Sequence, residues 1–246
     1  MASSARAFLT AEWRDIAMLN YRVAPELLAP YVPAGTELDH WGSHTYVSLV
    51  GFRFARTRLL GAVVPWHRNF EEVNLRFYVR REHAGGTRRA VVFIRELVPR
   101  RAIALVARCA YNEPYLAVPM QHRLGEIDPE TGAPCNVEYS WAIGGRAMGM
   151  CVEPTGQPTM PGTGSEIEFI TEHYWGYTRQ RDGGTIEYRV EHPQWRVWVA
   201  RSARVDGPVA SLYGSALGDV LTRAPDSAFL AEGSAVTVFA PTRLPD

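Results

Sequence analysis

A tight turn between two runs of aromatic and β-branched residues constrains this chain more than any other feature. The first run spans residues 166–178, the turn is Arg181-Asp-Gly-Gly184, and the second run spans residues 185–199. An Asp-Gly pair tolerates the positive φ angles that a two-residue turn requires. The pattern therefore predicts a β-hairpin between residues 165 and 200.

The turn also predicts which residues face each other. A loop of Asp182 and Gly183 pairs three sets of residues on one face: His173 with His192, Trp175 with Val190, and Tyr177 with Tyr188. Charged residues alternate onto the other face, so we expect the histidine face to be buried. The two imidazoles would then meet with Cβ atoms roughly 5 Å apart. A Gly183-Gly184 loop would instead place His173 opposite Gln194 and separate the histidines.

A buried histidine has two interpretations. It is more often a core residue whose nitrogens are satisfied by neighbours than a functional group. For two histidines that face each other across one strand pair, we give the core interpretation and the functional interpretation about equal weight.

Composition bounds the class of protein. A chain of 246 residues with no net charge fits a single domain with a sizeable core and argues against nucleic-acid binding. It has no apolar run long enough to cross a bilayer and no signal-peptide segment, so we expect a cytoplasmic protein without a membrane partner. The odd number of cysteines, without metal-type spacing, favours a reducing compartment. The sequence is compatible with a homo-oligomer and does not determine the oligomeric state.

The sequence contains no lysine. This absence excludes Schiff-base formation on a lysine, a P-loop lysine and a lysine general base.

Strand patterns outnumber helix patterns along the chain. Strands are expected at residues 13–23, 45–54, 71–80, 90–98, 138–143, 148–152 and 234–240, and helices at 25–33, 100–110 and 211–223. Residues 153–164, rich in Pro, Gly and Thr, are expected to form a surface loop or a lid. The meander order favours a mainly β fold, an antiparallel barrel or sandwich.

The strand expected at residues 71–80 has one apolar face and one polar face. Its apolar positions are Val73, Leu75, Phe77 and Val79, and they alternate with Glu72, Asn74, Arg76 and Tyr78. One face is expected to pack in the core, and the other places a carboxylate, an amide and a guanidinium side by side.

Several stretches resemble the YqjF-like bacterial family, which is grouped with the acetoacetate decarboxylase-like superfamily. They are residues 70–79, 111–115, 169–177, 191–196 and 229–234. The resemblance covers nearly the whole chain and implies one domain, residues 1–246: a cone-shaped, mostly antiparallel β-barrel with a few short helices and an internal ligand pocket.

The same resemblance excludes the decarboxylase chemistry. Those enzymes form a Schiff base through a lysine that directly follows a proline, and Tyr115 stands at that position after Pro114. A phenol cannot form an imine. The decarboxylases also carry a pocket glutamate, and Glu72 is the residue that resembles it.

Three functions follow for the predicted pocket. The first is a lysine-independent enzyme for a small organic acid or ketone, with catalytic residues Glu72, Tyr115, His173 and His192 and a substrate carboxylate on Arg76 or Arg108. Glu72 and Arg76 lie about 13 Å apart along their strand, so a bound acid could bridge them.

The second function is non-catalytic binding of a small aromatic or apolar acid. It would use the aromatic residues Trp41, Trp175, Tyr177 and Tyr188. The third, ranked last, is a divalent metal site on the two histidines with Glu72 as a further ligand. No cofactor and no resident metal are predicted, and the expected partner is a small-molecule ligand.

Overall fold

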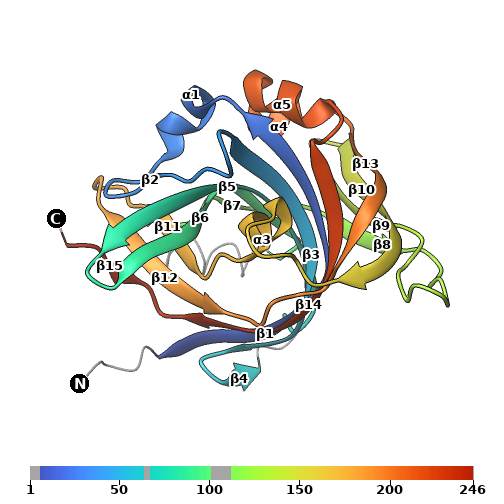
Figure 1. Cartoon of the computed structure of the whole chain (residues 1–246), viewed down its shortest axis with the longest axis horizontal. Helices are drawn as coiled ribbons and strands as arrows, with labels where there is room; N and C mark the ends of the chain where they lie inside the picture. Colours follow the sequence, from blue (N-terminus) through green and yellow to red (C-terminus); the bar gives the residue numbers. More distant parts are fainter. Residues whose placement is uncertain (1–5, 64–66, 101–111, 246) are drawn as a thin grey trace.

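A strongly curved sheet forms the body of the protein in a computed structural model of the chain (Figure 1). The structure describes residues 6–63, 67–100 and 112–245. The strands are β1 Ala7–Val23, β2 Glu37–Leu38, β3 Thr45–Leu59, β4 Ala62–Val63, β5 Phe70–His83, β6 Gly86–Val98, β7 Tyr115–Ala117, β8 Met120–Leu124, β9 Val137–Ile143, β10 Arg146–Thr159, β11 Trp175–Arg179, β12 Thr185–Glu191, β13 Val197–Asp206, β14 Ser227–Phe239 and β15 Thr242–Arg243. The helices are α1 Pro25–Leu28, η1 Ala29–Tyr31, α3 Glu166–Thr171, α4 Ala210–Tyr213 and α5 Ser215–Thr222. None of the described helices is long and apolar enough to cross a membrane.

The sheet closes on itself to form a ring. Hydrogen-bonded neighbours run in the order β12, β11, β6, β5, β3, β1 and β14. Val190 of β12 pairs with Val238 of β14 and completes the circuit. Within the described residues only β11 and β7 pair in parallel, both with β6, and the other pairings are antiparallel. The prediction of a mainly β, mostly antiparallel fold with a few short helices is confirmed.

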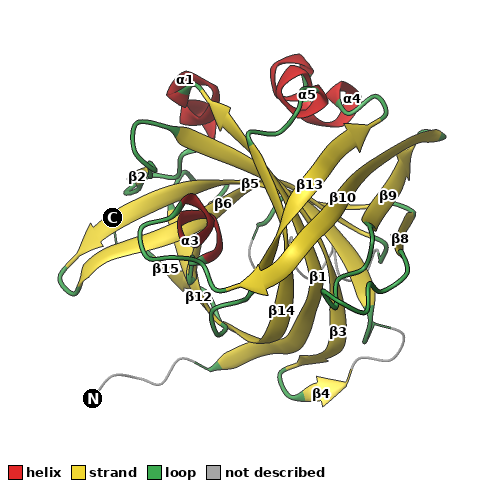
Figure 2. Ribbon diagram, turned by 45° about the vertical axis from the view of Figure 1, so that its right-hand side comes forward, coloured by secondary structure: helices red, strands yellow, loops and turns green. Residues whose placement is uncertain are grey.

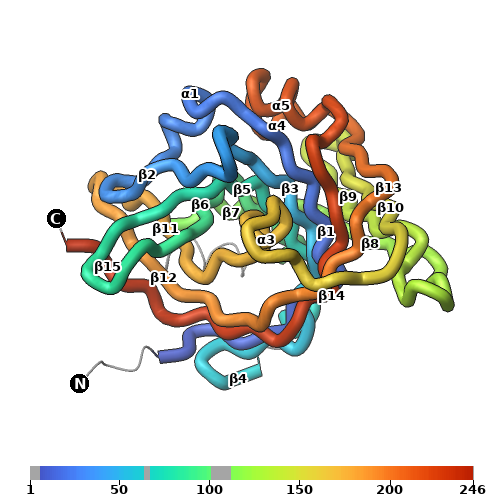
Figure 3. The backbone as a smooth tube through the Cα atoms, in the orientation of Figure 1, coloured from blue at the N-terminus to red at the C-terminus, as the bar shows by residue number. Residues whose placement is uncertain are grey.

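The first and last long strands lie side by side in this ring. Figure 3 shows β1 next to β14, with pairing from Ala7 and Phe239 to Asn20 and Ser227. A contact between the two ends of the sequence holds the ring together.

A second layer covers the outer face of β1, β3 and β5. The sheet continues from β14 through β13, β10, β9 and β8, and α4 and α5 lie near α1 at one end (Figure 2). Leu19 and Leu49 face this outer core, whereas their neighbours Met18 and Val50 face the ring interior. Because side chains alternate along a strand, these strands are buried on both faces.

The hairpin is present, but its predicted register is wrong. Trp175 pairs with Arg189, and Tyr177 pairs with Glu187, one position away from the expected partners. The Gln180 N–H donates to the Gly184 carbonyl at 2.7 Å, and Gly183 has a φ of +88°. The loop thus contains three residues with glycine in the left-handed position, another conformation that an Asp-Gly sequence favours. The Gly183-Gly184 alternative is also wrong.

The first arm of the expected hairpin is partly helical. The Ser165 hydroxyl accepts a hydrogen bond from the Glu168 N–H at 3.1 Å and caps α3. This Ser-x-x-Glu sequence is a helix-start signal that outweighs the β-branched composition of the short segment. His173 consequently follows a helix, and His192 follows the end of β12, so neither histidine lies within the paired strands. The Val190 N–H donates to the Tyr174 carbonyl at 2.9 Å and keeps the two segments adjacent.

Two other predicted elements differ from the structure. The expected loop or lid at residues 153–164 is largely the end of β10, which continues to Thr159. The expected helix at residues 211–223 is divided at Gly214, whose φ is +82°. The helix predicted at residues 100–110 lies outside the described residues.

Candidate functional site

A cavity of about 230 Å³ lies inside the ring. Aromatic and aliphatic side chains make most of its wall, and a volume of this size suits a small organic molecule. The polar residues at the wall are Thr57, His67, Glu72, Asn74, Arg76, Glu96, Glu113, Tyr115, Thr171, His173, Tyr188 and His192.

Strand β5 supplies the predicted row of polar groups. Glu72, Asn74 and Arg76 all line the cavity, while Val73 and Leu75 between them are fully buried in the outer core. The alternation in the sequence therefore placed these three side chains correctly.

Glu72 is a buried carboxyl group held by two donors. Asn74 Nδ2 donates to its Oε1 at 3.1 Å, and the Tyr115 hydroxyl donates to its Oε2 at 3.0 Å. Burial in the apolar cavity raises the pKa of Glu72 to about 7, although both hydrogen bonds and the charge of Arg76 act in the opposite direction. A carboxyl group with this pKa can both accept and return a proton near neutral pH.

A bulge in β6 turns Glu96 toward the same cavity. Leu75 pairs with Arg95 but Arg76 pairs with Phe93, so Ile94 is an extra residue in β6. The bulge reverses the alternation, and Glu96 faces the cavity together with Phe93. In the sheet Glu96 lies between Asn74 on β5 and Tyr115 on β7.

Glu113 brings a third buried carboxyl group to this end of the cavity. It accepts hydrogen bonds from the Thr178 hydroxyl at 2.5 Å and the Tyr188 hydroxyl at 3.0 Å. Burial and the neighbouring carboxylates raise the pKa of Glu96 well above its ordinary value. Burial raises the pKa of Glu113 to about 7. Like charges this close favour protonated carboxyl groups at neutral pH.

A glycine makes room for the tyrosine that contacts Glu113. The Tyr188 ring lies across Gly176 on the paired strand, and a Cβ atom there would come within 2.2 Å of the ring. Any larger residue at position 176 would displace the Tyr188 hydroxyl from Glu113.

Arg76 brings a positive charge to the cavity wall. One of its terminal nitrogens donates to the Ile170 carbonyl at 3.2 Å, and its Nε is buried without a partner. None of the ion pairs within 4.0 Å among the described residues involves Arg76. Its charge is therefore available to an anionic ligand.

The two predicted histidines both line the cavity, but in different settings. His173 is 7% exposed, neither ring nitrogen has a hydrogen-bond partner, and burial, with the charges of Arg89 and Arg76, holds its pKa well below the ordinary value. His192 stacks on Trp195 with ring centroids 4.1 Å apart, and Nδ1 lies 2.9 Å from the Pro193 carbonyl. Burial also lowers the pKa of His192. Both imidazoles are neutral hydrogen-bonding groups at pH 7.

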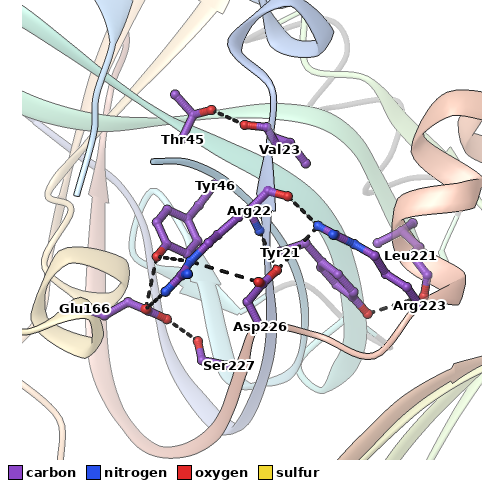
Figure 4. Close-up of polar contacts among 10 residues, drawn as sticks. All are labelled: Tyr21, Arg22, Val23, Thr45, Tyr46, Glu166, Leu221, Arg223, Asp226 and Ser227. Atoms are coloured by element: carbon purple, nitrogen blue, oxygen red, sulfur yellow. Dashed lines mark hydrogen bonds and ion pairs between the residues drawn. The ribbon is translucent and has the colours of Figure 1, made fainter. Parts of the chain in front are cut away.

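Helix α3 is fixed at its first turn, and this fixes the residues that follow it (Figure 4). Glu166 accepts hydrogen bonds from the Tyr46 hydroxyl at 3.0 Å and from Ser227. Arg22 in turn donates to the Tyr46 hydroxyl at 3.1 Å. These contacts join α3 to β1, β3 and β14, so the helix presents Thr171 and, just beyond its end, His173 to the cavity.

Seven of the ten predicted site residues meet at this cavity. They are Glu72, Arg76, Tyr115, His173, Trp175, Tyr188 and His192. Trp41 instead donates its indole N–H to the Gly164 carbonyl at 3.0 Å, and Tyr177 is buried in a separate cluster. Arg108 lies outside the described residues.

The sequence did not lead us to include Glu96 and Glu113, two of the three cavity carboxyl groups, among the expected site residues. Glu96 and its neighbour Arg95 are the charged residues of an apolar strand pattern at residues 90–98, and an acidic residue there was the available signal. Glu113 is two residues before Tyr115 in a stretch already noted for its resemblance. The bulge that turns Glu96 inward had no sequence signal that we recognised.

The metal hypothesis finds no support in the described geometry. Within residues 6–63, 67–100 and 112–245, no group of three His, Cys, Asp or Glu side chains is arranged to hold a metal ion. Cys135 is exposed and Cys151 is buried, and both are free thiols.

Comparison with known proteins identifies the family. Residues 10–235 match the family model DUF2071, described as an uncharacterized conserved protein. The chain belongs to the DUF2071 family. It is also 25% identical over 197 residues to the uncharacterized protein YqjF of Bacillus subtilis (strain 168), covering 79% of this chain and 75% of that protein.

Solved structures share the fold. Acetoacetate decarboxylase from Legionella pneumophila superposes with a TM-score of 0.71 at 12% identity, over 97% of this chain and 88% of that one. The enduracididine biosynthesis enzyme MppR, complexed with pyruvate, gives a TM-score of 0.68 at 11% identity, over 100% and 93%. An acetoacetate decarboxylase-like enzyme from Sphingomonas wittichii RW1 gives 0.63 at 14% identity, over 97% and 93%. The acetoacetate decarboxylase-like fold expected from the sequence is confirmed, and at these identities the likeness concerns the fold alone.

Proposed function

We propose that this protein is an enzyme that acts on a small organic acid or ketone by acid–base chemistry without a Schiff base. The observation that carries the proposal is Glu72, a buried carboxyl with a pKa of about 7 that contacts Tyr115 and shares a cavity with Arg76. The substrate carboxylate would lie on Arg76, and the carbon that reacts would lie near Glu72.

The chemistry that fits these groups is proton transfer next to a carbonyl group. The Glu72 carboxylate removes a proton from the α-carbon, and the electron pair of the broken C–H bond forms the enolate. Burial raises the pKa of Tyr115 well above its ordinary value, so its hydroxyl stays protonated. Once Glu72 has taken up the proton, the Tyr115 hydroxyl can turn from Glu72 and donate its hydrogen bond to the enolate oxygen. Protonated Glu72 exchanges its proton with solvent and then protonates the carbon, so in D₂O the α-carbon gains a deuteron.

Hydrogen–deuterium exchange tests this step without knowledge of the full reaction. The protein is incubated in D₂O with 2-oxobutanoate or 4-oxopentanoate, and exchange at the α-carbons is followed by proton NMR. We expect faster exchange than in buffer and a loss of about 100-fold or more in Glu72→Gln. Glu71→Gln is the matched control, because Glu71 contacts His122 at 2.7 Å and does not line the cavity.

The alternative function is non-catalytic binding of a small apolar acid. The mostly apolar wall of the cavity favours it. In that case the same acids bind, as seen by saturation-transfer NMR, but wild-type protein gives no exchange above buffer. That result would contradict an acid–base enzyme for these compounds.

A further inference from the structure

We infer that the ligand carries a second polar group, a basic nitrogen in cationic form, which lies against Glu96 and Glu113. The inference deepens the proposed function: it rests on a ligand carboxylate at Arg76 and names the class as a small amino or guanidino acid.

Three acceptor oxygens at this end of the cavity lack a partner. They are Asn74 Oδ1, Glu96 Oε2 and Glu113 Oε2, and the residues are 2%, 2% and 5% exposed. Asn74 uses its Nδ2 to donate to Glu72, which leaves its oxygen for another donor. A buried acceptor without a donor costs free energy, so a ligand that brings N–H donors to these oxygens gains affinity.

The carboxyl groups at this end of the cavity also favour a cationic group on the ligand. None of the ion pairs within 4.0 Å among the described residues involves Glu72, Glu96 or Glu113. Three carboxyl groups line an apolar cavity with the hydroxyl groups of Tyr115 and Tyr188, and the ionised form of each is destabilised by ionisation of the others. A bound ammonium or guanidinium group relieves this repulsion and takes the place of the protons on the carboxyl groups.

The spacing between the two ends sets the length of the ligand. Asn74 is paired with Glu96, and Arg76 lies two residues further along β5 on the cavity side. Two residues along a strand and one strand across give about 8 Å between the backbone positions of Arg76 and Glu96. His173, whose two ring nitrogens have no partner, lines the same cavity near Arg76 and can contact the carboxylate end of such a ligand.

Three probes of nearly equal length test the carboxylate end and the cationic end of the ligand independently. They are 6-aminohexanoate, which has both charges, heptanoate, in which a methyl group replaces the ammonium, and heptylamine, which has no carboxylate. We expect calorimetry at pH 7 to show 6-aminohexanoate binding at least 10-fold more tightly than heptanoate. Glu96→Gln and Glu113→Gln should each reduce this preference to 3-fold or less, and Glu71→Gln should preserve it.

Proton release gives a second readout. Cation binding favours ionised carboxylates, so wild-type protein should release protons when 6-aminohexanoate binds at pH 6.5, measured in buffers of different ionisation enthalpy. Binding of heptanoate should release fewer protons, and the Glu113→Gln variant should show no difference in proton release between the two acids. A circular dichroism spectrum and melting temperature like those of wild type show that each variant is folded.

The outcomes distinguish this inference from the proposed function. Heptanoate binding that depends on Arg76 and equals or exceeds 6-aminohexanoate binding overturns the cationic end and leaves the carboxylate end intact. Binding of heptylamine without either acid supports the cationic end and contradicts the carboxylate end. Binding of none of the three contradicts both.

Discussion

The Tyr115 hydroxyl donates a 3.0 Å hydrogen bond to Glu72 Oε2 across the width of β6, because β7 and β5 pair with opposite edges of that strand. The bond joins the carboxyl group that we expect to move protons to the phenol that we expect to stabilise the enolate oxygen. It also makes the pKa of Glu72 depend on a residue 43 positions away in the sequence.

Replacing Tyr115 with Phe should therefore raise the pKa of Glu72 above about 7. The lost hydrogen bond favoured the ionised form, so its removal favours the protonated form. Infrared difference spectra of the carboxyl band during a pH titration measure this shift, and the exchange rate should fall by about 100-fold. Tyr139→Phe is the control, because Tyr139 donates to the Asp15 carbonyl outside the cavity. An unchanged Glu72 titration in Tyr115→Phe would mean that the bond is unimportant.

The buried carboxyls should make stability fall as the pH rises. Burial raises the pKa of Glu113 from 4.5 to about 7, so the folded state retains a proton that the unfolded chain has released in this range. This contribution to stability is fully present below pH 4.5 and is lost as the pH rises through about 7. Glu113→Gln keeps an acceptor for Thr178 and Tyr188 but cannot ionise.

Relative to wild type, Glu113→Gln should thus gain stability between pH 5 and pH 8, by about 2 kcal/mol at the upper end. Urea unfolding at several pH values measures the difference. Glu71→Gln should not show this gain. A Glu113→Gln variant that loses stability relative to wild type as the pH rises would contradict the raised pKa.

Replacing Arg76 with Met should weaken the binding of acids selectively. Methionine keeps much of the length of arginine but none of its charge, so an acid should lose affinity by about 10-fold or more while its amide or methyl ester changes little. Calorimetry with such matched ligands measures both. Arg80→Met is the control, since Arg80 contacts Glu37 at the surface. Equal losses for acid and ester would show that Arg76 has only a structural role.

Reductive trapping should fail inside the cavity. A chain without lysine offers only its terminal amine to a carbonyl compound. After treatment with 2-oxobutanoate and borohydride, mass spectrometry of peptides should locate any adduct at that amine. A stoichiometric adduct on a cavity residue would overturn the Schiff-base-independent chemistry.

The sequence determined the features that depend on local periodicity. The alternation along β5 placed Glu72, Asn74 and Arg76 on one face, and the absence of lysine excluded a class of chemistry. Both follow from residue type and strand geometry alone, so neither depends on what packs against the strand.

The tertiary structure decided which other groups join that face. The extra residue Ile94 turns Glu96 inward, and pairing along β7 and across β11 and β12 brings Tyr115 and Glu113 beside it. A one-residue change in register or a single bulge exchanges the two faces of a strand, and the backbone hydrogen bonds that set it come from residues far away in the sequence. For the same reason, the hairpin sequence predicted a turn but not its register, and the two histidines reach the cavity from the segment after α3 and from the end of β12.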